Sequence, residues 1–287
     1  MTTLEHPRHD DRPPRREHRG AEVRGLRLDT LTDTDVASIR SELYRHGVLF
    51  FPRPGDRPGD PPGVRAAFRR DRVSAPALGE PRAEGYPEIS VIGTDNGSAY
   101  QANRWHCDVA WRAEPSRYSI LHMQVLPEAG GDTLCRTSTQ PSTRSRPPIR
   151  EALYGLTATH RIGPVPNAPE ASHPLVIRHP DTGREALFVN DLFTERIDGL
   201  SDDESRALLG LLKSVSIRPE FTVRRRWAVG DIAIWDNHFV QHNAIYDYGD
   251  AARRIHRIEA APRGADPGAL TDPTAQTIRP ERKATKS

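Results

Sequence analysis

The chain has 287 residues, enough to bury a sizeable core as one large domain or as two small ones. Its 41 Lys and Arg residues nearly balance its 39 Asp and Glu residues, and the net charge of +2 favours neither a nucleic acid nor a membrane surface as a partner. The two cysteines, Cys107 and Cys135, cannot build a disulfide framework. The polar N-terminus predicts no signal peptide, and no apolar run is long enough to span a bilayer, so we expect a soluble cytoplasmic protein.

Both ends of the sequence are polar and rich in Pro, Arg and Asp, a composition that buries too little apolar surface to order a chain. Residues 1–20 and 263–287 are therefore predicted to be disordered tails. Residues 21–262 are predicted to form a single domain.

Two segments carry the spacing of amphipathic helices. The first, residues 32–47, ends at a glycine, and the apolar run 48–51 follows it as a buried strand. The second, residues 200–215, begins with a capping box formed by Ser201 and Glu204. The apolar faces are Val36, Ile39 and Leu43 in the first helix, and Leu208, Leu211, Leu212 and Val215 in the second.

Short strands are indicated in the remainder of the chain. Two stretches rich in proline, residues 53–63 and 137–148, are predicted to be loops. Strands do not alternate regularly with helices, so the pattern favours a mainly β protein, an antiparallel sandwich or barrel with flanking helices. The predicted strands are 118–126, 184–190, 230–236 and 253–260.

The stretch NRWHCDVAW, residues 103–111, carries the first candidate chemistry. Its aromatic and β-branched residues predict a strand, in which His106 and Asp108 point to one face and Cys107 to the other. A histidine and a carboxylate that converge are two thirds of a 2-His-1-carboxylate metal site. The alternative is a histidine held by a neighbouring carboxylate for structural reasons, and a third ligand must come from elsewhere in the chain.

Candidates for that ligand, His238 and His242, follow an apolar strand near the C-terminus. In the next strand, Arg253 and Arg257 share a face. An arginine that points into a barrel is costly unless an anion meets it, and a small dicarboxylate bound by the guanidinium would supply that anion. The alternative is an edge strand whose arginines are solvated.

Several motifs together resemble the taurine/2,4-D dioxygenase (TauD/TfdA) family of Fe(II)- and 2-oxoglutarate-dependent oxygenases. The resemblance runs from about residue 20 to about residue 262, with the motifs in the family's order and with similar spacing. It implies a double-stranded β-helix, a jelly roll with helices on one side. The motifs are WHCDVAW, GGDTL (130–134), ALFVN, PEF, GDIAIWDN and QHNAIYDY followed by RRIHR.

The resemblance also implies roles for individual residues. His106, Asp108 and His242 match the family's iron ligands. Thr133 and Arg253 match the residues that hold 2-oxoglutarate. The implied reaction converts 2-oxoglutarate and O2 to succinate and CO2 while a C–H bond of the substrate is oxidised, by hydroxylation or by desaturation or epoxidation.

Two residues are tentative candidates for binding the primary substrate. Arg257 matches an arginine that reaches toward the substrate's acid group in taurine dioxygenase, and His238 stands where relatives often carry arginine. The segment 79–88, GEPRAEGYPE, lacks the sulfonate-binding histidine of that enzyme, and residues 159–173 are much shorter than its lid insertion. These departures argue against taurine and favour a bulkier or less acidic substrate.

The sequence therefore leaves three candidate functions. The leading one is an oxygenase acting on a small molecule in specialised metabolism, such as antibiotic biosynthesis. The second is a catabolic dioxygenase for a sulfonate, an alkyl sulfate or an aryloxyalkanoate. The third is a catalytically silent jelly-roll binding protein, against which the complete set of matching site residues argues. A small molecule is the expected partner, and a homo-oligomer is left open.

Overall fold

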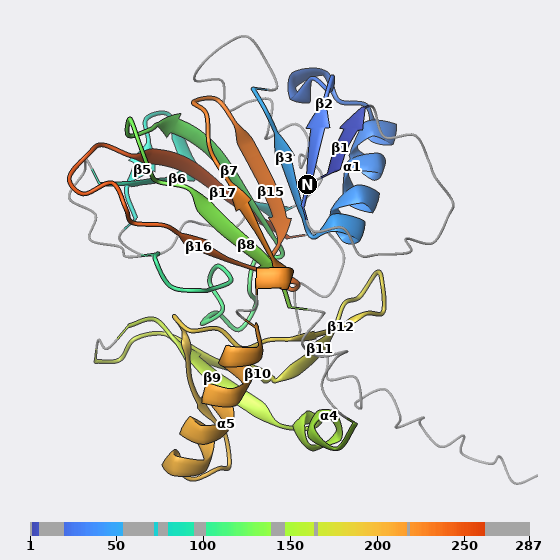
Figure 1. Cartoon of the computed structure of the whole chain (residues 1–287), viewed down its shortest axis with the longest axis vertical. Helices are drawn as coiled ribbons and strands as arrows, with labels where there is room; N and C mark the ends of the chain where they lie inside the picture. The colour runs from blue at the N-terminus through green and yellow to red at the C-terminus, as the bar shows by residue number, and fades with distance from the viewer. Residues whose placement is uncertain are drawn as a thin grey trace, which may run out of the picture.

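The computed structural model describes residues 2–5, 20–53, 72–73, 80–94, 102–138, 147–163, 166–216 and 219–261. Within these ranges the chain is mainly β, with one large sheet and three smaller ones. Figure 1 shows the large sheet and the helix α1 (Asp33–His46) in the upper part of the molecule, and the helices α4 (Pro147–Leu153) and α5 (Asp202–Ser216) in the lower part.

The large sheet contains nine strands. Its order is β1-β2-β3-β15-β7-β17-β6-β5, and β4 pairs with β17 beside this path. Most of its pairs are antiparallel, but β1 with β2 and β2 with β3 are parallel. The bounds are β1 Thr2–Glu5, β2 Ala21–Arg24, β3 Val48–Phe51, β4 Arg72–Val73, β5 Arg82–Ala83, β6 Tyr86–Gly93, β7 Tyr118–Val125, β15 Ile232–Asp236 and β17 Arg254–Ala261.

A second sheet of three antiparallel strands, β14-β8-β16, packs against this one. Its strands are β8 (Thr133–Thr137), β14 (Thr222–Arg225) and β16 (Val240–Ala244). One core cluster joins the two sheets, with Phe50 and Trp235 from the large sheet and others from the small one. The arrangement is the predicted jelly roll.

Alternation along the strands of the large sheet creates a second core. Phe50 faces the space between the sheets, whereas its neighbours Leu49 and Phe51 face the opposite side. There they meet Ile39 and Leu43 of α1, two residues of the predicted helical stripe. Both clusters are almost fully buried, which fixes the strand register because a shift by one residue would expose every core side chain.

The first helix begins and ends as its sequence predicts. The Thr32 hydroxyl accepts a hydrogen bond from the Asp35 backbone, and the Asp35 carboxylate accepts one from the Thr32 backbone. Gly47 ends the helix with a φ of 76°, a conformation that costs glycine little.

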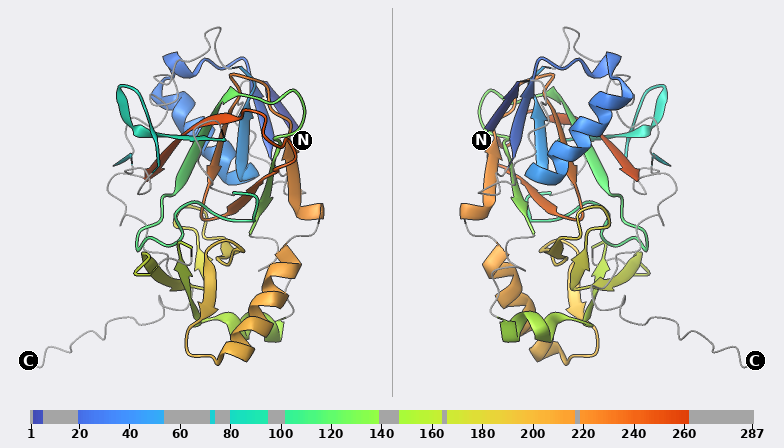
Figure 2. Two further views of the ribbon diagram at one scale, coloured as in Figure 1. Left: turned by 90° about the vertical axis from the view of Figure 1, so that its left-hand side faces the viewer. Right: turned by 90° about the vertical axis from the view of Figure 1, so that its right-hand side faces the viewer.

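The lower part of the molecule is a smaller layer built from the middle of the chain. Figure 2 shows from two sides that α4 and α5 lie at the end of the molecule away from α1. Two small sheets, β10-β9-β13 and β11-β12, pack with α5 around a third core cluster. The bounds are β9 Thr157–Arg161, β10 Glu170–Pro174, β11 Val176–Arg178, β12 Glu185–Leu187 and β13 Thr194–Ile197.

The buried face of α5 differs from the predicted one. Its capping box is present, since the Ser201 hydroxyl and the Glu204 carboxylate each accept a hydrogen bond from the other's backbone. However, Leu209 and Leu212 are buried, whereas Leu211 is 47% exposed. The consecutive leucines fit two helical faces, and the packing against β13 selects the one that includes Leu209.

The predicted loops and tails are only partly described. Thr2–Glu5, expected to be part of a disordered tail, pairs in parallel with β2. Pro147, expected in a loop, begins α4, a position where proline's fixed φ and missing N–H suit a helix. Of the other residues in the predicted loops and tails, residue 20, Arg53, residues 137–138 and residue 148 are described, and the rest, including 54–63 and 263–287, lie outside the described ranges. In the described ranges no helix combines the length and apolar character that a membrane crossing needs.

Candidate metal centre

Two histidines from distant parts of the sequence are joined by their backbones. The His106 N–H donates to the His242 carbonyl at 3.0 Å, and the His242 N–H donates to the His106 carbonyl at 2.8 Å. His242 lies in β16, whereas His106 forms only this isolated bridge. The predicted strand over residues 103–111 is therefore wrong, although the two imidazoles do lie close together, with ring centroids 4.0 Å apart.

A turn after His106 aims Asp108 at the same point. Val109 has a φ of 48°, a conformation that is strained for a β-branched residue, and its carbonyl accepts a hydrogen bond from the Arg112 N–H at 2.9 Å. Val109 itself is buried in the core between the sheets, and this burial offsets the strain. Cys107 packs in the same core, and its thiol lies 3.6 Å from the side-chain amide nitrogen of Asn190.

The side chains of His106, Asp108 and His242 offer three ligand atoms that lie within 4.8 Å of one another. Each imidazole Nε2 is 3.9 Å from Oδ1 of Asp108. The other nitrogen of His106, Nδ1, lies 2.7 Å from the carbonyl oxygen of Arg104. A metal-binding histidine usually donates its second N–H in this way, so the donor set fits a 2-His-1-carboxylate iron site.

The protonation states also suit metal binding. Burial lowers the pKa of His106, and burial together with the His106 imidazole lowers the pKa of His242 to about 3. Burial alone would raise the pKa of Asp108, but Arg257 and the two imidazoles outweigh it and hold that pKa below its usual range. At neutral pH the site therefore offers two neutral imidazoles and one carboxylate, the forms that bind a cation.

Neighbouring side chains fix the orientation of Asp108. The Ser119 hydroxyl donates to Oδ2 at 2.6 Å, and Nη1 of Arg257 donates to Oδ1 at 2.7 Å. The backbone N–H of Asp108 donates to Oδ1 of Asn237 at 3.3 Å, and Nδ2 of Asn237 donates to the Ser119 hydroxyl at 2.8 Å. The sequence motifs assign no role to Ser119 or Asn237. The sequence feature that could have identified Ser119 is its place among the apolar residues of a buried strand.

Arg253 and Thr133 lie together, as the resemblance implies. Nη2 of Arg253 is 3.5 Å from the Thr133 hydroxyl, and Nε donates to the Gly131 carbonyl at 3.0 Å. The Thr133 hydroxyl also accepts a hydrogen bond from Nε1 of Trp227 at 2.9 Å. Arg253 and Thr133 are buried, with exposures of 5% and 1%.

Arg257 is surrounded by carboxylates. Besides Asp108, its guanidinium contacts Glu80 at 2.6 Å and Glu259 at 3.4 Å, both through Nη2. Burial raises the pKa of Glu259 to about 7, against the influence of Arg257. Glu259 is therefore partly protonated at neutral pH. The structure thus places Arg257 beside Asp108, in contact with three acidic side chains.

His238 belongs to a different cluster from His106, Asp108 and His242. Its ring centroid is 6.5 Å from that of His179, whose Nε2 lies 2.9 Å from Oδ2 of Asp236. Arg117 completes this buried group through a contact with Asp236 at 3.2 Å. Burial lowers the pKa of His238 to about 4, so its imidazole is neutral. The structure therefore does not bring His238 and Arg257 together.

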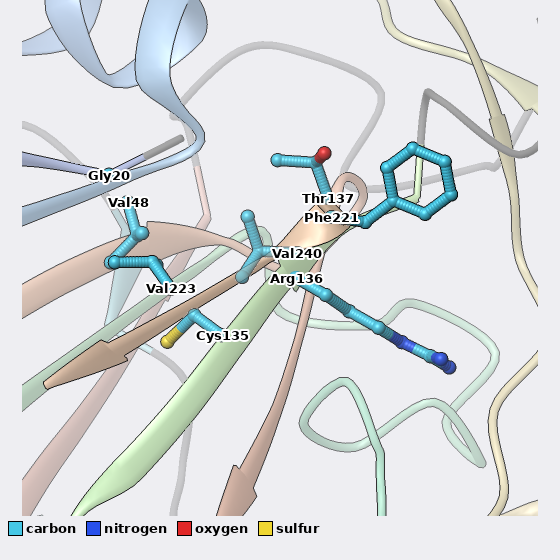
Figure 3. Close-up of a pocket in the computed structure, with 8 residues that line it drawn as sticks. All are labelled: Gly20, Val48, Cys135, Arg136, Thr137, Phe221, Val223 and Val240. Atoms are coloured by element: carbon cyan, nitrogen blue, oxygen red, sulfur yellow. The ribbon is translucent and has the colours of Figure 1, made fainter. Parts of the chain in front are cut away.

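A small apolar pocket lies on the side of β8 and β16 that faces β3. Valines from three strands line it, whereas His106, Asp108 and His242 do not. Figure 3 shows the Arg136 side chain extending away from Val48 and Cys135. Its guanidinium lies 4.7 Å from the Trp105 ring and donates to Oε1 of Gln241 at 2.5 Å. Of the two polar residues in its lining, Arg136 turns its guanidinium to Trp105 and Gln241 and only Thr137 remains, so we treat this space as part of the core.

The comparisons with known proteins agree with this geometry. A family model described as taurine catabolism dioxygenase TauD, TfdA family matches residues 10–258. An alkylsulfatase from Acinetobacter baylyi is 34% identical over 266 residues, which cover 84% of this chain and 82% of the relative. An alpha-ketoglutarate-dependent sulfate ester dioxygenase from Pseudomonas putida is also 34% identical, over 283 residues that cover 86% of this chain and 89% of the relative.

A crystal structure of a taurine dioxygenase from Burkholderia xenovorans has the same fold. It superposes with a TM-score of 0.75 at 31% sequence identity, and the match covers 86% of this chain and 89% of that one. The chain belongs to the TauD/TfdA family and is a dioxygenase that depends on Fe(II), 2-oxoglutarate and O2.

Proposed function

We propose that His106, Asp108 and His242 hold the iron, and that the enzyme oxidises a C–H bond of a small molecule. The convergence of the three ligand atoms within 4.8 Å is the observation that carries this proposal. Bound Fe(II), with 2-oxoglutarate and O2, supplies the oxidising power for this reaction. The contribution of the chain is to present the three ligands on one side of the metal and to hold their protonation states.

Arg253 and Thr133 hold the far carboxylate of 2-oxoglutarate in this proposal. The Arg253 guanidinium is buried, and a buried guanidinium gains most from an anion that accepts two hydrogen bonds from its planar fork. Its Nε is engaged by the Gly131 carbonyl, which orients the fork toward Thr133. The Thr133 hydroxyl, fixed by Trp227, is then in place to contact the same carboxylate.

The ligand assignment predicts that His106→Ala loses both iron binding and turnover. Removing one of three protein ligands leaves the cation with a neutral imidazole and one carboxylate. Anaerobic Fe(II) binding and succinate formation from 2-oxoglutarate measure the two losses. The matched control is His256→Ala, because His256 is a half-buried histidine on β17. This variant retains both iron binding and succinate formation. Iron affinity that is unchanged in His106→Ala would contradict the assignment.

The primary substrate has two candidate classes. A small molecule of specialised metabolism is the first, supported by the carboxylates that already surround Arg257. A sulfate ester is the second, supported by the names of the two relatives at 34% identity. For the location of the protein we propose the cytoplasm, since Cys107 and Cys135 are both free, as suits a reducing compartment.

A further inference from the structure

Glu80 is held beside the metal centre by two hydrogen bonds. Its Oε1 accepts from Nη2 of Arg257 at 2.6 Å, and its Oε2 accepts from the Ser90 hydroxyl at 2.5 Å. Ser90 lies on β6 directly opposite Arg257 on β17, so the strand pairing itself fixes both donors. The Glu80 side chain is 19% exposed and that of Arg257 is 5% exposed. This ion pair is therefore largely removed from water and weakly screened.

The same guanidinium reaches the metal ligand. Nη1 of Arg257 is 2.7 Å from Oδ1 of Asp108, the oxygen that faces Nε2 of both histidines. Arg257 is thus a buried cation in direct contact with a proposed iron ligand. A sulfate, sulfonate or carboxylate group on a substrate bound beside the metal would be attracted to this guanidinium.

The charge of Arg257 is already compensated without such a group. Asp108 is a proposed iron ligand, and Glu259 also contacts Arg112 at 3.5 Å, so Glu80 is the carboxylate left to balance the guanidinium. An anionic head group that approached Arg257 would meet Glu80 at a similar distance, and attraction and repulsion would nearly cancel. Displacing Glu80 would also break its hydrogen bond to Ser90.

We propose that Glu80 sets the charge class of the primary substrate: through its ion pair with Arg257 it selects an uncharged group next to the metal and disfavours sulfate esters and sulfonates. This inference rests on the proposed iron site and chooses the first of the two substrate classes. Glu80 is a positioning residue for Arg257, and a glutamine at position 80 keeps its shape while removing the charge that repels anions.

The test compares a charged and an uncharged probe of similar length, hexyl sulfate and N-hexylacetamide. Isothermal titration calorimetry measures the binding of each to protein loaded with Mn(II) and 2-oxoglutarate. The wild type binds hexyl sulfate no more tightly than N-hexylacetamide. Glu80→Gln tightens the Kd for hexyl sulfate by about tenfold or more, while the Kd for N-hexylacetamide changes by less than about threefold. Glu84→Gln, an exposed glutamate in the same segment, changes neither.

A second variant assigns the gain to Arg257. Adding Arg257→Gln to Glu80→Gln abolishes the tighter binding of hexyl sulfate. A wild type that already binds hexyl sulfate about tenfold more tightly than N-hexylacetamide overturns the proposal, and so does a Glu80→Gln protein with no gain. Succinate formation by the wild type with Fe(II) is measured in parallel. Its absence would contradict the proposed function, whatever the calorimetry gives.

Discussion

Ser119 links Asp108 to Asn237 at the proposed metal centre. Its hydroxyl donates to Asp108 and accepts from Asn237, so a chain of hydrogen bonds runs from the Asn237 amide to the carboxylate. All three residues are almost completely buried. Water therefore does not replace a lost partner, and each group in the chain depends on the next.

We predict that Ser119→Ala lowers Fe(II) affinity by about 10- to 100-fold. Removing the hydroxyl leaves Oδ2 of Asp108 and Nδ2 of Asn237 short of a partner, and the folded state loses about 1–3 kcal/mol. Anaerobic titration with Fe(II) and denaturant unfolding measure the two effects. Ser214→Ala, an exposed serine on α5, is the control. Wild-type iron affinity in Ser119→Ala would show that the ligand is oriented without this hydroxyl.

The proposed iron ligands stand out in the sequence, but the contacts that support them do not. His106 and Asp108 are close in sequence and His242 follows a recognisable strand, so a motif exposes them. Asn237 contacts Asp108 across 129 residues of sequence, and Glu80 contacts Arg257 across 177. Such pairings depend on the strand register of the folded sheets, which a single sequence does not specify.

Among the secondary-structure elements, α5 shows the limit of reading a helical pattern. Its capping box fixes where the helix begins, and that part of the prediction is confirmed. Its rotation about its own axis is set by β13 and the third core cluster. The predicted strand over residues 103–111 is wrong for a related reason. Its aromatic and β-branched residues pack into the core from a turn rather than from a strand.

The packing of α5 predicts different costs for two neighbouring leucines. Leu209→Ala removes a side chain that is 5% exposed and lowers the free energy of unfolding by about 2–5 kcal/mol. Leu211→Ala removes one that is 47% exposed and changes it by about 0.5 kcal/mol or less. Denaturant unfolding of both variants measures the difference. Equal losses would mean that the helix is rotated relative to the structure.

Across the whole molecule, buried neutral histidines make stability depend on pH. Burial lowers the pKa of His160 to about 3 and that of His238 to about 4. In the unfolded chain the same groups bind protons near pH 6.5, so between these values the unfolded state holds more protons. Stability from these residues is present above pH 6.5 and is lost as the pH falls toward their folded pKa values.

We predict that the free energy of unfolding falls by about 1.4 kcal/mol per pH unit for each such histidine between about pH 6 and pH 4.5. Denaturant unfolding at a series of pH values measures the slope. The phenylalanine in His160→Phe cannot titrate. The pH slope of the unfolding free energy is therefore smaller in this variant than in the wild type by the contribution of one histidine. If the slope of this variant equals that of the wild type, His160 is accessible to protons in the folded protein.

The backbone bridge between His106 and His242 has a consequence for how the enzyme acquires its metal. During translation, His106 and Asp108 leave the ribosome well before β16 is made. A nascent chain at that stage has two of the three ligands and no partner strand to hold them. If these three residues hold the iron, we expect it to load only after the polypeptide is complete, so that the share of active enzyme follows the Fe(II) that the finished protein meets after its release.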